Sequence, residues 1–370
     1  MKLMALYLPQ FHSFPENDAW WGKGYTEWTA VKRARPLFPG HIQPKEPLDG
    51  HYYDLDKEGK ETLMKQAELA NRYGIYGFTF YQYYFTGKKL MEKPLETLLK
   101  TPEIPLRYNI CWANETWTRA WYDRKEEVLI KQEYGGEKEW EEHFSCLLPF
   151  FKDPRYIKAD GKPMLLIYRT FDIAVLPEMR EYFERRLKEE GFPGLYLVGG
   201  KTAWQEEERT GLVDAWYVFE PGRTLKHHLS GSRRLSYNIS VAGNTLLNRF
   251  RKEKRLERKI PIEWIYKSIE QRTYEENEFP GIIAEWDNTP RRGYKGLVYT
   301  GAEPGRFETA LRALAEKVEG RKNDFVFLNA WNEWGEGAAI EPDKRWKDAY
   351  LKAVSRVAEG PAAAAGLQEP

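Results

Sequence analysis

Two glutamates, Glu333 and Glu336, stand three positions apart in the segment NAWNEWGEG, where Trp331 and Trp334 flank the first of them. Glycosidic cleavage needs two carboxyl groups around one bond, one to donate a proton and the other to act as nucleophile or base. Neighbouring carboxyls repel each other's charge, which raises one pKa and suits that group to be the acid. A polar surface loop is the alternative, but the position directly after a predicted buried strand favours a catalytic pair.

A second cluster follows another predicted strand and contains Trp112, Asn114, Glu115, Trp117 and Arg119. Indole rings stack on the apolar faces of sugars, and amide, carboxylate and guanidinium groups hydrogen-bond hydroxyls. The cluster therefore predicts sugar contacts. The alternative is that its glutamate and arginine only pair with each other.

A third cluster contains Trp286, Asp287 and Asn288, followed by Arg291 and Arg292. Adjacent arginines after a barrel strand can bind a phosphate or an acidic sugar, because guanidinium groups bind such anions in two-pronged geometry. A structural salt bridge to the aspartate explains the same residues equally well. We predict that the tryptophan, the aspartate, the asparagine and Arg292 contact substrate.

Aromatic residues recur in the first long loop, where residues 16–28 either form one wall of a cleft or pack over the end of the fold. The complete set of predicted substrate-binding residues is His12, Trp28, Tyr81, Tyr83, Trp112, Asn114, Glu115, Trp117, Arg119, Trp286, Asp287, Asn288, Arg292, Trp331, Asn332 and Trp334. The histidines show no metal-ligand spacing, and no phosphate-binding loop is present, so we predict neither a metal nor a cofactor.

Short apolar runs that alternate with helix-period segments position these residues. The predicted strands cover 1–8, 75–81, 106–112, 163–168, 194–198, 215–219, 282–286 and 325–330, and the predicted helices cover 57–73, 92–100, 138–151, 176–190, 304–318 and 346–358. About eight such units predict an α/β fold, a (β/α)8 TIM barrel with long βα loop insertions at 9–53, 113–137 and 220–280. Residues 1–359 form one predicted catalytic domain, and 360–370 a disordered tail.

The composition of the chain argues against some classes of protein. The chain has 370 residues, with 57 Lys and Arg against 56 Asp and Glu, a formal charge of +1 that argues against a nucleic-acid binder. Aromatic residues make up 15% of the chain, which suits a cleft walled by flat rings. No apolar run approaches about 20 residues, and no signal peptide is evident, so we predict a cytoplasmic protein without a transmembrane segment. The oligomeric state stays open.

The basic run 249–259 has interspersed glutamates at a spacing that predicts a solvated helix with Glu–Lys and Glu–Arg pairs. Attraction to a membrane surface or to a polysaccharide is the alternative. Cys111, at a predicted strand end, is expected to be a packed thiol rather than a nucleophile.

Several motifs together resemble the WbsX family, also described as glycosyltransferase WbsX or glycoside hydrolase family 99-like. They are YLPQFH at 7–12, NDAWWGKGYTEW at 17–28, CWANE at 111–115, DPRY at 153–156, WDN at 286–288 and NAWNEWGEG at 329–337. The resemblance covers about residues 1–350. More distantly, NEWGEG at 332–337 resembles the family 99 endo-α-mannosidases, which are (β/α)8 barrels and retaining enzymes.

That resemblance implies a retaining glycoside hydrolase acting on an oligosaccharide or polysaccharide. Glu333 would take the proton of the sugar's own 2-hydroxyl, and Glu336 would protonate the leaving oxygen and then activate water. This chemistry favours α-mannoside- or α-rhamnoside-type linkages, in which the 2-hydroxyl lies opposite the leaving group. A WbsX-type glycosyltransferase of O-antigen or surface-polysaccharide assembly is the first alternative, and a non-catalytic sugar-binding barrel is the second.

Overall fold

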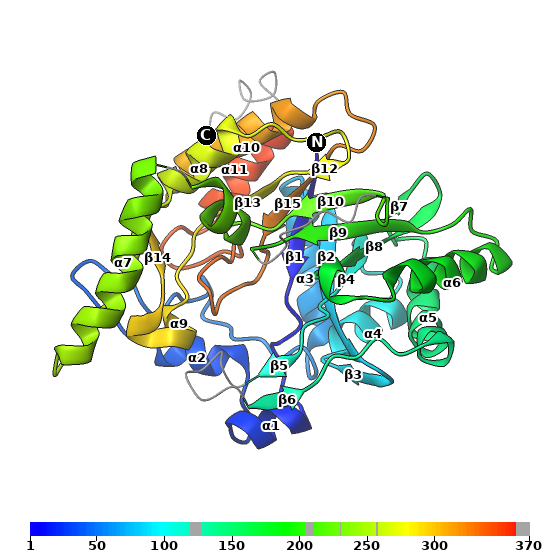
Figure 1. The fold of residues 1–370 in the computed structure, drawn as a ribbon, viewed down its shortest axis with the longest axis horizontal. Coiled ribbons are helices and arrows are strands. Elements are labelled where there is room, and N and C mark those ends of the chain that lie inside the picture. Colours follow the sequence, from blue (N-terminus) through cyan, green and yellow to red (C-terminus); the bar gives the residue numbers. More distant parts are fainter. Residues whose placement is uncertain (119–126, 204–210, 230, 257, 360–370) are drawn as a thin grey trace.

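The computed structural model describes residues 1–118, 127–203, 211–229, 231–256 and 258–359, and its centre is a barrel of parallel strands (Figure 1). In chain order these strands are β1 (Lys2–Tyr7), β2 (Gly77–Phe85), β4 (Tyr108–Trp112), β8 (Lys162–Ile167), β9 (Tyr196–Lys201), β10 (Ala215–Val218), the pair β12 (Glu278–Phe279) and β13 (Gly281–Ile283), and β15 (Phe325–Asn329). The predicted (β/α)8 barrel is confirmed.

The barrel closes through a strand that is interrupted at Pro280. β12 pairs with β10 on one side, and β13 pairs with β15 on the other. Proline has no backbone N–H to donate, but its carbonyl still accepts a hydrogen bond from the Phe327 N–H at 2.8 Å. A Cβ atom at Gly281 would lie 1.9 Å from the Val218 carbonyl oxygen, so this close approach of the two strands requires glycine.

Helices cover the outside of the barrel, each with its apolar side inward. They are α3 (Gly59–Arg72), α4 (Lys93–Lys100), α5 (Glu137–Lys152), α6 (Leu176–Glu189), α8 (Glu263–Gln271), α10 (Pro304–Val318) and α11 (Ala349–Ala358). The α8 segment lies inside the predicted 220–280 insertion, and no helix was predicted over its residues. The remaining predicted helices occur within three residues of their expected bounds.

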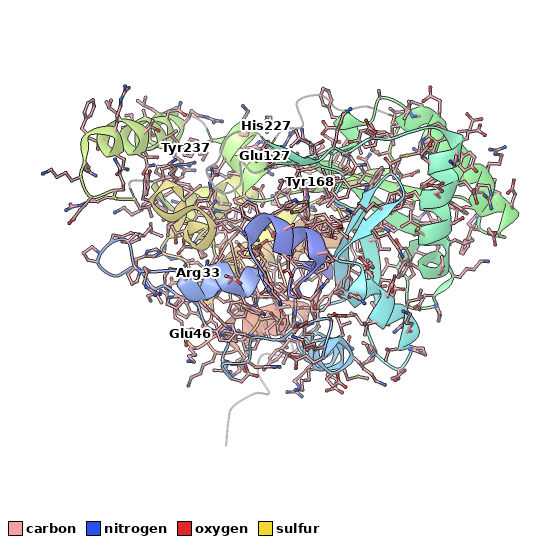
Figure 2. The ribbon with its side chains drawn as sticks, turned by 90° about the horizontal axis from the view of Figure 1, so that it is seen from below. Arg33, Glu46, Glu127, Tyr168, His227 and Tyr237 are labelled. Atoms are coloured by element: carbon pink, nitrogen blue, oxygen red, sulfur yellow. The ribbon has the colours of Figure 1, made fainter. Side chains whose placement is uncertain are left out.

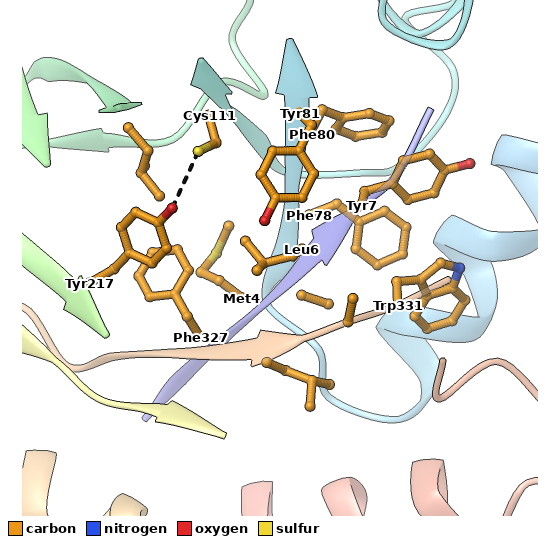
Figure 3. Close-up of a cluster of buried hydrophobic side chains, with 14 of the residues drawn as sticks. Met4, Leu6, Tyr7, Phe78, Phe80, Tyr81, Cys111, Tyr217, Phe327 and Trp331 are labelled. Atoms are coloured by element: carbon orange, nitrogen blue, oxygen red, sulfur yellow. Dashed lines mark hydrogen bonds between the residues drawn. The ribbon is translucent and has the colours of Figure 1, made fainter. Parts of the chain in front are cut away.

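Large side chains from neighbouring strands are buried on both faces of the barrel sheet, toward its interior and toward the surrounding helices (Figure 3). Tyr7 packs against Phe78 and Phe80, with ring centroids 5.4 and 4.3 Å apart. Cys111 is fully buried, 3.6 Å from the Tyr217 hydroxyl, and burial raises the pKa of its thiol to about 12. A thiol in this environment stays protonated, which agrees with a packing role.

The long loops after the strands form further elements at the carboxyl end of the barrel and along its side. They are α1 (Pro15–Trp21), α2 (Glu27–Arg33), β3 (Lys88–Leu90), β5 (Trp117–Thr118), β6 (Val128–Ile130), α7 (Gly231–Phe250), β11 (Lys259–Pro261), α9 (Thr289–Arg292) and β14 (Val298–Thr300). The short β7 (Lys158–Ala159) instead precedes β8 and pairs with its first residues. Within the described residues, no helix is both long enough and apolar enough to cross a bilayer.

The basic run 249–259 does not form the predicted helix. α7 ends at Phe250, the described residues from 251 to 258 are irregular, and β11 begins at Lys259. The structure gives the reason in Asn248, whose side chain bonds both backbone groups of Arg255 at 2.7 Å and so turns the chain back. The predicted tail 360–370 lies outside the described residues.

Candidate active site

A cavity of about 330 Å³ opens among the loops that follow the barrel strands. Its lining is rich in aromatic side chains, and three of its glutamates contact one arginine. The lining residues are Leu8, Gln10, Phe14, Asn17, Trp20, Trp21, Tyr25, Glu27, Tyr81, Tyr83, Met91, Ala113, Glu115, Trp117, Thr118, Leu129, Tyr168, Ala203, Phe219, Gly222, Trp286, Arg291, Glu333 and Glu336. Figure 2 views the molecule from this end and labels Tyr168 above its centre.

Glu333 and Glu336 lie at this cavity and are joined by one guanidinium group. Nη2 of Arg291 lies 2.9 Å from Oε1 of Glu333, and its Nη1 lies 3.1 Å from Oε1 of Glu336. The same arginine contacts Oε2 of Glu27, from α2, at 2.9 Å. The side chains of Arg291, Glu333 and Glu336 are only 9%, 7% and 16% exposed, so these charges interact in a largely dehydrated setting.

Burial raises the pKa of both Glu333 and Glu336 above the usual carboxyl value, and Arg291 opposes the rise. The neighbouring Glu27 carboxylate raises the pKa of both groups further. Like charges this close do not ionise independently, so the pair tends to keep one proton. The backbone N–H of Glu336 donates to Oε1 of Glu333 at 3.1 Å, and this bond favours the ionised form of Glu333. The pair thus offers an acid and a base side by side.

Backbone hydrogen bonds fix the turn that carries Glu333 and Glu336. The Ala338 N–H donates to the Glu333 carbonyl at 2.9 Å, and the Asp287 N–H donates to the Glu336 carbonyl at 2.7 Å. A Cβ atom at Gly335 would lie 2.3 Å from Oε2 of Glu27, so only glycine lets this carboxylate approach the turn. Glycine at position 335 therefore leaves room for the carboxylate of Glu27 beside Glu333 and Glu336.

The residues on either side of Glu333 face the protein interior. Trp331 and Trp334 are 0% and 1% exposed, and their indole N–H groups donate to the buried carboxylate of Glu341 at 3.0 and 2.7 Å. Asn332, also fully buried, bonds both the N–H and the carbonyl of Leu8, at 2.8 and 3.0 Å. These three side chains anchor the turn at 333–336 from behind instead of lining the cavity.

Five of the predicted sugar-binding residues do line the cavity: Tyr81, Tyr83, Glu115, Trp117 and Trp286. The Tyr83 hydroxyl accepts a hydrogen bond from the Gln10 amide at 3.0 Å. Burial raises the pKa of Glu115, although Nη1 of Arg169 lies 3.1 Å from its Oε1 and opposes the rise. The described partner of Glu115 is thus Arg169.

Four further predicted contacts lie in the interior, where each has a structural partner. Trp28 donates to the Tyr53 carbonyl at 2.8 Å, and Trp112 to the Tyr84 carbonyl at 3.0 Å. The Asn114 amide bonds backbone groups of Arg169 at 2.8 Å and so ties two strand ends together. His12 is 2% exposed, and its Nδ1 lies 3.1 Å from the Ser13 carbonyl oxygen. They support the cavity wall from behind.

Asp287 and Asn288 of the third cluster both form hydrogen bonds within the protein. Asp287 bonds His41, Gln43 and Thr289 at 2.6 to 2.7 Å, and these hydrogen bonds lower its pKa in spite of burial. Asn288 accepts the Leu297 N–H at 2.7 Å.

The two arginines at the end of α9 have different surroundings. Arg291 pairs with the glutamates, whereas Arg292 is exposed but near enough for its charge to oppose the rise in the pKa of Glu336. Arg119 lies outside the described residues.

Several cavity residues were not among the predicted contacts. Arg291 was considered as an anion-binding group or as a structural partner of Asp287, and Glu27 only as part of the aromatic segment. Trp20, which meets Trp117 edge-on at 5.7 Å, and Tyr168, which meets Tyr81 at 6.2 Å, extend the aromatic wall. The clustering of aromatics at 16–28 was the sequence signal for this wall. Within the described residues no group of three or more His, Cys, Asp or Glu side chains is placed to hold a metal ion.

The family can be assigned from the whole length of the fold. A family model described as Glycosyltransferase WbsX matches residues 3–354. The chain belongs to the WbsX family. The expected resemblance is thereby confirmed, and the matched range includes both the barrel and the turn at 333–336.

Curated relatives of this WbsX chain include the uncharacterized protein WxcX from two strains of Xanthomonas campestris pv. campestris. Each is 34% identical over 366 residues, a match that covers 96% of this chain and 50% of the relative. The chain therefore spans about half the length of the curated relatives it matches.

Solved structures with a similar fold include the GH99 endo-alpha-mannosidase from Bacteroides thetaiotaomicron, with a TM-score of 0.56, 13% identity and 96% of each chain covered. A glycoside hydrolase-like protein gives a TM-score of 0.56 at 16% identity, covering 96% of this chain and 93% of the other. At these identities the similarity concerns the fold.

Proposed function

We propose that the chain is a retaining glycoside hydrolase that cleaves α-mannoside- or α-rhamnoside-type linkages in an oligosaccharide or a polysaccharide of bacterial type. The observation that carries the proposal is the pair Glu333 and Glu336, bridged by Arg291 at an aromatic-lined cavity. A pair that keeps one proton supplies both partners that glycosidic cleavage needs. The aromatic wall, including Trp117 and Trp286, suits the apolar faces of sugar rings.

In the first step Glu333 takes the proton of the sugar's 2-hydroxyl, and the oxygen so released attacks the anomeric carbon from the face opposite the leaving group. The glycosidic bond breaks as Glu336 gives its proton to the leaving oxygen, and a 1,2-anhydro sugar results. In the second step Glu336 takes a proton from water, which attacks the anomeric carbon. The bond between O2 and that carbon breaks, and Glu333 returns the proton to O2. Two inversions give net retention.

Arg291 has a defined part in this scheme. Its guanidinium contacts both glutamates at about 3 Å and carries no proton that the reaction needs. It therefore positions the two carboxyl groups and limits the rise in their pKa values. Tyr81, Tyr83 and Glu115 are the proposed polar contacts to sugar hydroxyls, because each lines the cavity.

Glycosyl transfer is the second candidate, and the name of the matching family favours it. The same two glutamates serve this reaction if the hydroxyl of an acceptor sugar replaces water in the second step. The exposed cation of Arg292, close enough to affect Glu336, is the proposed contact for an anionic donor or substrate. Hydrolysis remains our first proposal, because every step is assigned to a residue at the cavity.

The test is NMR of the full chain with synthetic α-mannosides and α-rhamnosides, and separately with nucleotide-sugars and acceptors. We expect release of sugar with retained configuration, abolished by Glu336→Gln and by Glu333→Gln but unaffected by Glu319→Gln, which changes an exposed glutamate. Turnover that requires both a nucleotide-sugar and an acceptor would assign transfer instead. Sugar binding without turnover in either assay would leave a non-catalytic binding barrel and refute both enzymatic proposals.

A further inference from the structure

The helix α7 presents polar residues to the protein and apolar residues to solvent. Its buried side chains are Asn244 and Asn248, which are 5% and 4% exposed. By contrast Leu235, Ile239 and Phe250 are 61%, 62% and 78% exposed. A surface helix normally buries its apolar stripe against the core, so this reversed arrangement requires an apolar environment outside the described structure.

The exposed apolar residues form one continuous stripe. Leu235, Ile239, Leu246 and Phe250 follow one another at intervals of four, seven and four, which places them on one face of a helix. Leu247, 45% exposed, lies beside the stripe. Figures 1 and 2 show α7 at the edge of the molecule, projecting beyond the barrel, so this face is open along its length.

Positive charge is concentrated in the same segment. Residues 231–259 contain nine Lys and Arg but only two Glu, a net charge of +7 in a chain whose total is +1. The helix itself, residues 231–250, has no acidic residue. The bonds from Asn248 to Arg255 fold residues 251–255 back beside the end of the stripe, where Lys252 and Lys254 are exposed.

We infer that α7 and the basic turn after it dock on an anionic phospholipid surface. The apolar stripe enters the boundary between headgroups and acyl chains, and the cations contact lipid phosphates, as in interfacial amphipathic helices. A second copy of the chain fits less well, because pairing two such faces would bring together two segments that each carry a net charge of +7. The inference does not depend on the proposed reaction.

Co-sedimentation with vesicles tests this docking. We expect the full chain to bind vesicles of phosphatidylcholine with phosphatidylglycerol, to bind pure phosphatidylcholine at least about tenfold more weakly, and to be released between about 0.1 and about 0.5 M salt. The variant Ile239→Asp with Phe250→Asp should lose about tenfold or more of the binding. Arg249→Gln with Lys252→Gln should lose a similar factor and weaken the salt dependence.

Leu48→Asp is the matched control, since it places an acid on a 44%-exposed leucine elsewhere on the surface and should leave binding unchanged. All four residues to be changed on α7 and the basic turn are exposed, so the variants should keep the unfolding midpoint of the parent. Absence of binding to anionic vesicles would overturn the inference, as would equal binding by the Asp variant. A wild-type dimer that the Asp variant converts to monomer, without vesicle binding, would assign the face to self-association instead.

Discussion

Replacing Glu341 by glutamine should remove a specific dependence of stability on pH. This carboxylate is buried and accepts hydrogen bonds from Trp331, Trp334, Tyr53 and Gln66, at 2.6 to 3.0 Å. Burial raises its pKa from 4.5 to about 7, although these donors oppose the rise. The folded protein thus binds this proton more tightly than the unfolded chain does.

The magnitude follows from that difference in pKa. The stabilisation by this proton is fully present below pH 4.5 and is lost as the pH rises through about 7. At about 1.4 kcal/mol for each tenfold change in proton affinity, the loss amounts to about 3 kcal/mol. Glutamine has no proton to release, so the variant lacks this contribution. Between pH 4.5 and pH about 8, stability should therefore shift by about 3 kcal/mol in favour of Glu341→Gln relative to wild type.

Urea unfolding followed by tryptophan fluorescence measures this difference, because all other titrating groups are common to the two proteins. The exposed variant Glu319→Gln is the control and should stay within about 0.5 kcal/mol of wild type at every pH. If wild type and Glu341→Gln gave parallel curves of unfolding free energy against pH, the assignment of a raised pKa to this carboxyl would be refuted.

Three further predictions concern the site and its supports. Arg291→Met should lower kcat/KM by about 10² to 10³ and shift the pH–rate profile to higher pH, because loss of the cation lets the pKa of both Glu333 and Glu336 rise. Arg291→Lys should recover part of the activity. A profile that does not shift would contradict the proposed role of the arginine. Trp117→Ala should raise KM about tenfold with kcat changed less than about twofold in steady-state kinetics, and a fall in kcat alone would exclude a binding role. Asn332→Ala should destabilise the fold by about 2 to 4 kcal/mol in urea titrations, since it leaves two buried backbone groups of Leu8 unpaired. A loss of less than about 1 kcal/mol would show that the hydrogen bonds between Asn332 and Leu8 are dispensable.

The strand pattern could be predicted from sequence because each barrel strand is a short apolar run, buried on both faces and bounded by turn residues. The run FVFLNA at 325–330, for example, became β15 almost residue for residue. The placement of Glu333 and Glu336 followed from the same pattern, since residues after parallel strands gather at one end of a barrel. The interrupted strand at Pro280 was located only by its second half.

The orientation of side chains within the loops could not be predicted in the same way. Trp331 and Trp334 adjoin Glu333 in sequence, yet they point to Glu341, a partner that lies beyond the motif. Arg291 contacts Glu27 across 264 residues of chain. Such contacts depend on how separate loops fold over the barrel, which no local spacing encodes.

The clamp between Asn332 and Leu8 joins positions separated by 324 residues. β1 is synthesised long before β15, and the two strands cannot pair until β15 has left the ribosome. Until then the edge of β1 that will meet β15 has no partner, and Glu333 and Glu336 are still unsynthesised. Nascent chains that stall before β15 should therefore expose an open sheet edge and depend on chaperones, and the proposed activity should appear only after the turn at 333–336 has emerged.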